Sequence, residues 1–145
     1  MSGKLTVTES HPLMLPEAAW GRIKVGARTP PVRVREGWLA FIDGVDELEH
    51  PSGAALMRYC AGVIIQGAER LDRVIFRSPG PSSSAGLPAR STVPSGHVVF
   101  PTAIDARGER AFDIYFGMAD CEIGRGRLDL CPENGCAVCP SMVKW

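Results

Sequence analysis

Residues 31–45 read PVRVREGWLAFIDGV, and this stretch decides the fold class of the chain. Valine alternates with arginine up to Glu36 and Gly37, which form a two-residue turn, and an apolar run returns over 38–45. Two such segments on either side of a two-residue turn are typical of a β-hairpin. The returning run carries a single carboxylate, Asp43, and the question is whether it serves chemistry.

The segments around this hairpin continue the same pattern. They are short, rich in valine, isoleucine and aromatic residues, and separated by turn residues, whereas helical periodicity is hard to find. Strands are predicted at 31–35, 38–45, 56–66, 73–78, 97–105, 111–118 and 121–130, with a connector at 46–55. The first four strands make an antiparallel meander. The predicted fold class is therefore all-β.

A loop rich in serine, proline and glycine, residues 79–96, joins two segments that look alike. GWLAFIDGVD, ending at Asp46, and AFDIYFGMAD, ending at Asp120, share the order aromatic, apolar, glycine and aspartate. Recurring four-stranded antiparallel units suggest about two blades of a β-propeller, too few to close a ring without another copy or chain. The predicted organisation is a lead-in over 1–19, a partial propeller over 20–130 and an atypical Cys/Pro-rich tail over 131–145.

Composition excludes several function classes. The 145 residues suffice for one domain with a core, and 16 basic residues balance 16 acidic ones. This balance gives no electrostatic footprint for nucleic acid or for an anionic membrane. The N-terminus MSGKLTVTES lacks a signal-peptide apolar region, and no run is long enough to span a bilayer, so a soluble cytoplasmic protein is predicted.

The cysteines do not predict a disulfide scaffold, because their number, five, is odd and two of them lie in apolar strand-like segments. In the tail, three cysteines follow C-x4-C-x2-C spacing, which can ligate zinc or an iron-sulfur cluster if Cys121 or His97 adds a fourth ligand. The tail cysteines are Cys131, Cys136 and Cys139. Because the tail is short and such spacing also arises by accident, neither a metal site nor a cofactor is predicted.

Residues 20–45, WGRIKVGARTPPVRVREGWLAFIDGV, resemble a segment of glycoside hydrolase family 130 with the pattern Trp, Lys-Val-Gly, Pro-Pro, Gly-Trp-Leu and Tyr-His-Gly-Val. The resemblance runs in order over about 13–130, and it continues at 59–78, 98–105 and 113–124. It implies a five-bladed β-propeller with the active site on its central axis, of which this chain matches the C-terminal portion. It also implies β-mannoside phosphorolysis or hydrolysis, with a β-mannoside or related oligosaccharide as ligand.

Several residues acquire roles by this resemblance. Lys24 and Arg28 match polar groups at the phosphate and sugar subsites, and Asp120 matches an aspartate that binds sugar hydroxyls. Trp20 and Trp38 are aromatic side chains that can stack on sugar rings. From the residues alone the alternatives stay open: a solvated strand edge for Lys24 and Arg28, a turn for Asp120, and blade packing for the two tryptophans.

One departure from the family pattern bears on phosphate. The Tyr-His-Gly of the phosphorylases, whose Tyr and His contact phosphate, reads Ile42-Asp43-Gly44 here. An ionised Asp43 facing phosphate at about 4 Å would cost roughly 4 kcal/mol per unit charge at an effective dielectric near 20. Hydrolysis is therefore favoured over phosphorolysis, although phosphate stays a candidate ligand, and Asp43 is a candidate for a substrate-binding role or a role near the attacking water.

A second departure concerns the catalytic acid. The proton-donating aspartate of the family lies ahead of the segments matched here, so the resemblance assigns no general acid to this chain. Four aspartates, Asp43, Asp105, Asp113 and Asp120, show no spacing that marks a catalytic pair. Three hypotheses follow: part of a mannoside-cleaving enzyme completed by a complementary N-terminal chain or by self-association, a non-catalytic sugar-binding module, or the truncated remnant of an enzyme gene.

Overall fold

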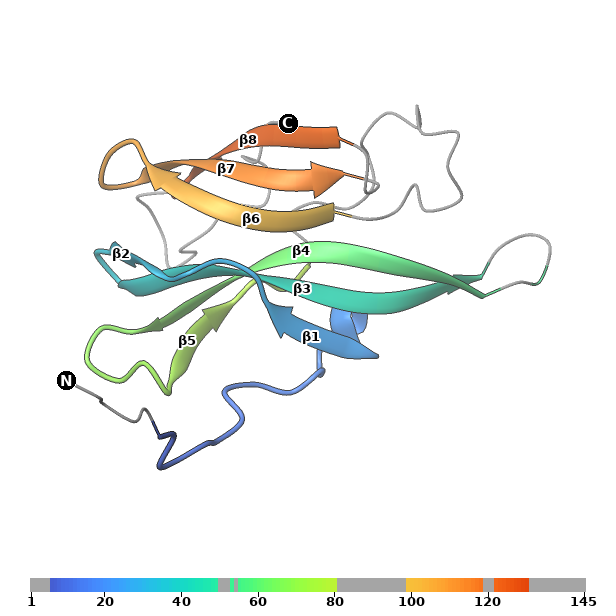
Figure 1. Ribbon diagram of the computed structural model, residues 1–145, viewed down its shortest axis with the longest axis horizontal. Helices are drawn as coiled ribbons and strands as arrows, with labels where there is room; N and C mark the ends of the chain where they lie inside the picture. The colour runs from blue at the N-terminus through green and yellow to red at the C-terminus, as the bar shows by residue number, and fades with distance from the viewer. Residues whose placement is uncertain (1–5, 50–52, 54, 81–98, 119–121, 131–145) are drawn as a thin grey trace.

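The computed structural model describes residues 6–49, 53, 55–80, 99–118 and 122–130, and within them the protein is all-β apart from one short 3-10 turn (Figure 1). The strands form two antiparallel sheets, one ordered β1-β3-β4-β5 with β2 also on β3, the other ordered β6-β7-β8. The elements are η1 (Ala19–Gly21), β1 (Lys24–Ala27), β2 (Val32–Val34), β3 (Gly37–Glu49), β4 (Ala55–Gly67), β5 (Val74–Arg77), β6 (Val99–Ala106), β7 (Ala111–Met118) and β8 (Glu122–Asp129). The predicted all-β class is confirmed.

A long hairpin of β3 and β4, 13 residues in each strand, forms the centre of the first sheet. The connector predicted over 46–55 is wrong in extent, because the ladder continues to the pair Glu49–Ala55. Polar cross-strand pairs carry this extension: Asp46 lies opposite Arg58, whose Nη2 donates to its carboxylate over 2.8 Å. Such pairs stabilise a sheet without the apolar alternation by which strands are predicted.

The edge of β3 is shared by two short strands. β2 pairs with the first part of β3 and β1 with the second, and the prolines at 30 and 31, which lack an N–H, separate them. The sequence does not predict β1 as a strand. Lys24, its first residue, does have a solvated strand edge as one of its predicted alternatives. The turn before β3 lies one residue earlier than predicted, since Gly37 already pairs with Val34.

The two sheets pack face to face, and the second contains three strands among the described residues where a four-stranded unit was predicted. Odd-numbered side chains of β3 and β4 point toward the second sheet, because successive side chains alternate between faces. The core between the sheets consists of Val34, Leu39, Phe41, Ala61, Val63, Ile65, Val99, Phe112, Ile114, Phe116, Leu128 and Leu130.

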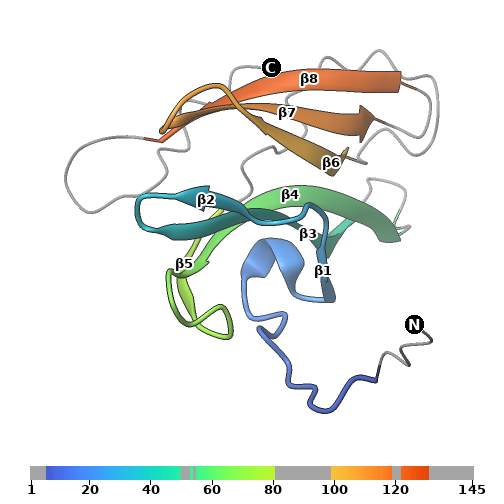
Figure 2. The ribbon, with the colours of Figure 1, turned by 60° about the vertical axis from the view of Figure 1, so that its left-hand side comes forward.

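The opposite face of the first sheet is covered by η1 and the segment before it (Figure 2). Trp20 is buried there against Ile42, and its ring lies where a Cβ on Gly44 or Gly62 would have to be. Of the two readings of Trp20, blade packing is therefore the one that the structure shows. The central part of the first sheet is buried on both faces, as a blade inside a stack of blades is.

Candidate functional site

A buried ion pair between Arg28 and Asp43 is the centre of the candidate site. Asp43 belongs to β3, faces the second sheet and is fully buried. Arg28 directly follows β1, where its backbone N–H donates to the carbonyl of Phe41 over 3.1 Å. Its Nη2 donates to Oδ2 of Asp43 over 2.7 Å, while 32 % of the Arg28 side chain stays exposed. The pair therefore has one end in the core and one end at the surface.

Small neighbours make room for the Asp43 carboxylate. Across the ladder Asp43 lies opposite Gly26 on one side and Ala61 on the other. A Cβ on Gly26 would lie 2.5 Å from Oδ1 of Asp43, so any larger residue at this position would displace the carboxylate. Oδ1 has no hydrogen-bond partner among the described residues, and a buried acceptor without a donor is costly. This oxygen has no exposed surface, so the ion pair with Arg28 is the contact that compensates the buried charge.

Two aromatic side chains from different sheets complete the cluster. The guanidinium carbon of Arg28 lies 4.6 Å from the ring centroid of Phe100, which belongs to β6. Phe100 contacts Tyr59 of β4 edge to face, with 5.4 Å between the ring centroids. The sequence reasoning missed both aromatic residues. Two features of the sequence could have indicated them. Tyr59 lies two residues before Ala61 and so on the same strand face, and both aromatic residues fall in segments that resemble the family.

Lys24 lies on the same face as this cluster. It is exposed and opposite Val45, whose other neighbour across the ladder is Tyr59. Residues directly opposite in an antiparallel pair point to the same side of the sheet. The structure therefore brings three of the predicted site residues, Lys24, Arg28 and Asp43, to one face of the first sheet.

Trp38 lies elsewhere. It occupies an even-numbered position of β3 and so points to the opposite face, where its Nε1 donates to the carbonyl of Ala68 over 3.3 Å and Arg33 stacks on its ring. The sheet separates it from the Arg28–Asp43 pair, and its sugar-binding role stays a prediction. Asp120, His97, Cys121 and the tail cysteines lie outside the described residues.

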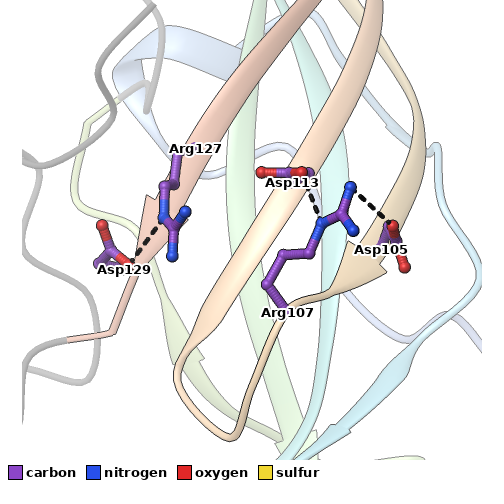
Figure 3. A network of polar contacts seen from close by, with 5 residues as sticks. All are labelled: Asp105, Arg107, Asp113, Arg127 and Asp129. Carbon is purple, nitrogen blue, oxygen red and sulfur yellow. Dashed lines mark hydrogen bonds and ion pairs between the residues drawn. The ribbon is translucent and has the colours of Figure 1, made fainter.

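Two further aspartates prove to be close neighbours. Asp105 of β6 and Asp113 of β7 lie opposite each other on the outer face of the second sheet, although eight positions separate them in the sequence (Figure 3). Arg107 lies between them, with Nε 2.7 Å from Asp113 Oδ2 and Nη2 3.4 Å from Asp105 Oδ2. The hydrogen bond from Arg107 holds the pKa of Asp113 below its usual range. A general acid near neutral pH needs a raised pKa, so Asp113 has the wrong electrostatics for proton donation.

The next carboxylate along the face of Asp43 is Glu47, which is exposed. Four residues of extended strand place it about 13 Å along β3. Inverting hydrolysis uses carboxyl groups roughly 6.5 to 9.5 Å apart, so Asp43 and Glu47 do not form such a couple. Within the described ranges no three metal-ligating side chains cluster, and no helix there has the length and apolarity to cross a membrane.

Solved structures share this fold, whereas comparison of the sequence with protein-family profiles and curated proteins finds no match. A β-1,2-mannobiose phosphorylase from Listeria innocua, in complex with β-1,2-mannobiose, aligns with a TM-score of 0.60 and 22% identity over 79% of this chain. A glycosyl hydrolase from Bacteroides ovatus aligns with a TM-score of 0.64 and 18% identity over 88% of it. The chain has the fold of a family 130 propeller segment.

A third structure aligns over 90% of the chain with a TM-score of 0.64 and 18% identity. It comes from the GH130 family of mannoside phosphorylases, which contains glycoside hydrolases that target β-1,2 mannosidic linkages in Candida mannan. The chain spans 29%, 36% and 36% of these three proteins. The fold implied by the resemblance is confirmed, and the activity stays a proposal.

Proposed function

We propose that the chain forms part of a β-mannoside site and that glycosidic cleavage at this site is hydrolysis rather than phosphorolysis. The observation that carries the proposal is the ion pair between Arg28 and the fully buried Asp43. Arg28 matches a position at the phosphate and sugar subsites of the family, and here its charge is already neutralised inside the protein.

The ion pair disfavours phosphate binding by neutralising Arg28, whereas the sequence predicts direct repulsion of phosphate by Asp43. Asp43 does not project freely toward a phosphate position, since it is buried and bonded to Arg28. At about 4 Å and an effective dielectric near 20, a cation attracts and an anion repels a phosphate charge by the same roughly 4 kcal/mol per unit charge. The two contributions largely cancel, which leaves Lys24 as a cation on this face that forms no ion pair with the described residues.

The same arrangement suits a neutral sugar. The exposed part of Arg28 offers N–H donors to sugar hydroxyls, and hydrogen bonds to ionised groups are stronger than those between neutral groups. Lys24 adds an exposed ammonium on the same face. The Listeria structure contains β-1,2-mannobiose, so a β-linked mannobiose is the first ligand to test.

A second candidate function is sugar binding without cleavage. Asp43 is buried and ion-paired, and Glu47 lies too far along the strand to be its partner in an inverting couple. Cleavage therefore depends on a carboxylic acid other than these two, in line with the expectation that the proton donor belongs to another segment or chain. Binding by itself needs no such group.

Titration with β-1,2-mannobiose, followed by product analysis with and without phosphate, tests both candidates. Hydrolysis predicts free mannose whether or not phosphate is present, and binding without products supports the second candidate. Mannose 1-phosphate would refute the preference for hydrolysis, and absence of binding would refute both. Asp43→Asn, which leaves Arg28 uncompensated, should raise the phosphate affinity at least about tenfold, and an unchanged affinity would contradict the neutralisation argument.

A further inference from the structure

We propose that Tyr59, oriented by Phe100, is the surface on which the ring of a β-mannoside packs, and that it selects the β anomer. The inference rests on the proposed function and adds a residue and a source of specificity to it. Phe100 contacts both Tyr59 and Arg28, so the aromatic pair and the ion pair form one cluster.

Tyr59 lies at the end of this cluster that is closest to solvent. Exposure along the shared face increases from Asp43, which is fully buried, through the half-buried Tyr59 to Met57, which is 41% exposed. Lys24, across the ladder beyond Val45, is exposed as well. A ligand can thus reach Tyr59 from solvent while its hydroxyls reach the polar groups beside it.

Phe100 has a different task. The guanidinium of Arg28 covers one face of its ring at 4.6 Å, and its contact with Tyr59 is edge to face at an interplanar angle of 61°. Aromatic pairs favour this arrangement, which fixes the direction in which the Tyr59 ring points. Phe100 is therefore a positioning residue, and Tyr59 provides the packing surface.

The stereochemistry of mannose explains the selection. In the chair form of a β-mannoside, the axial hydrogens on C1, C3 and C5 make one face of the ring apolar, and the axial 2-hydroxyl points to the other face. An α-mannoside carries its axial glycosidic oxygen on that otherwise apolar face. A flat aromatic ring gains by burying apolar surface and loses by desolvating an oxygen without a hydrogen bond. Tyr59 therefore favours the β anomer, and it does not separate β-mannosides from β-glucosides, which share the face.

Binding of methyl β-mannoside and methyl α-mannoside, measured by ligand-detected NMR titration, tests this inference. Tyr59→Leu, which keeps apolar volume without the flat ring, should weaken binding of the β anomer about tenfold and move the β-to-α preference toward one. Tyr59→Phe should bind within about threefold of wild type. Tyr115→Leu, the same change at the other tyrosine of the chain, on the outer face of the second sheet, is the matched control and should change neither affinity. Circular dichroism melting checks that every variant is folded.

The outcomes separate the inference from the proposed function. If wild-type protein binds mannosides and Tyr59→Leu keeps both the affinity and the anomeric preference, the inference is wrong and the proposed function stands. An effect of Tyr115→Leu as large as that of Tyr59→Leu would also overturn it. If wild-type protein binds neither anomer nor β-1,2-mannobiose, the proposed function and the inference fail together.

Discussion

Removing Arg28 is expected to destabilise the protein more than removing the charge of its partner. In Arg28→Met the fully buried Asp43 carboxylate loses its cation, and breaking a buried pair in this way costs about 3 to 5 kcal/mol. Because 32 % of the Arg28 side chain is exposed, water can partly replace it, and we expect about 3 kcal/mol, the lower end of that range. In Asp43→Asn the guanidinium can turn toward solvent, so the cost is about 1 to 2 kcal/mol, the loss of one charge-assisted hydrogen bond.

The double variant sharpens the prediction. With Asn at position 43 no buried charge needs a cation, so Arg28→Met costs little in that background. The two changes together should destabilise by about 2 kcal/mol less than the sum of the single changes. This coupling energy reports the interaction itself, whereas each single change also includes the altered packing.

Urea unfolding at neutral pH measures these differences, provided that the slope of the free energy against urea concentration is the same in all variants. Arg73→Met, at an exposed arginine, is the matched control and should stay within about 0.5 kcal/mol of wild type. Additive single changes, or an Arg28→Met variant no less stable than Asp43→Asn, would refute the view that Arg28 neutralises a buried carboxylate.

Three further predictions concern other contacts. Gly26→Ala places a Cβ 2.5 Å from the buried carboxylate oxygen and should cost about 1 to 3 kcal/mol in thermal or urea unfolding. Thr29→Val removes the hydroxyl that accepts the buried Phe41 N–H over 2.9 Å, so stability should fall by about 1 to 3 kcal/mol and the Phe41 amide should exchange faster with deuterium. Arg107 lowers the pKa of Asp113 in the folded protein, so the ionised carboxylate stabilises the fold above its unfolded pKa, near 4. This contribution is lost as the pH falls below that value. Asp113→Asn should therefore flatten the acid limb of a stability–pH profile.

Each of these three predictions has a control variant or an outcome that would contradict it. Gly117→Ala, where nothing lies within 4 Å of the added Cβ, should leave stability nearly unchanged, and an equal loss at Gly117 and Gly26 would show that the carboxylate is not responsible. Thr29→Ser keeps the hydroxyl and should keep most of the stability. An acid limb that is the same in wild type and in Asp113→Asn would mean that the ion pair in Figure 3 does not persist in solution.

The strands could be predicted where their signals are local. β7 occupies the predicted residues 111–118, because turn residues bound an aromatic and β-branched run there. β1 was missed, since its four residues, KVGA, are too few for alternation to show, and they form a strand only because β3 offers an edge. The extension of β3 and β4 was missed for the same reason: opposite charges such as Asp46 and Arg58 stabilise a ladder only when the partner strand is known.

For the candidate site, the sequence by itself determined the residue types and, by resemblance, singled out Lys24, Arg28 and Asp43. Only the tertiary structure decided that Arg28 bonds to Asp43 and that Phe100, from the other sheet, stacks beneath it. The physical reason is that alternation along a strand divides side chains between two faces, but the packing of distant segments decides what each face meets. Asp43 faces the second sheet and is buried against an arginine, while the tryptophan five residues before it faces the opposite way.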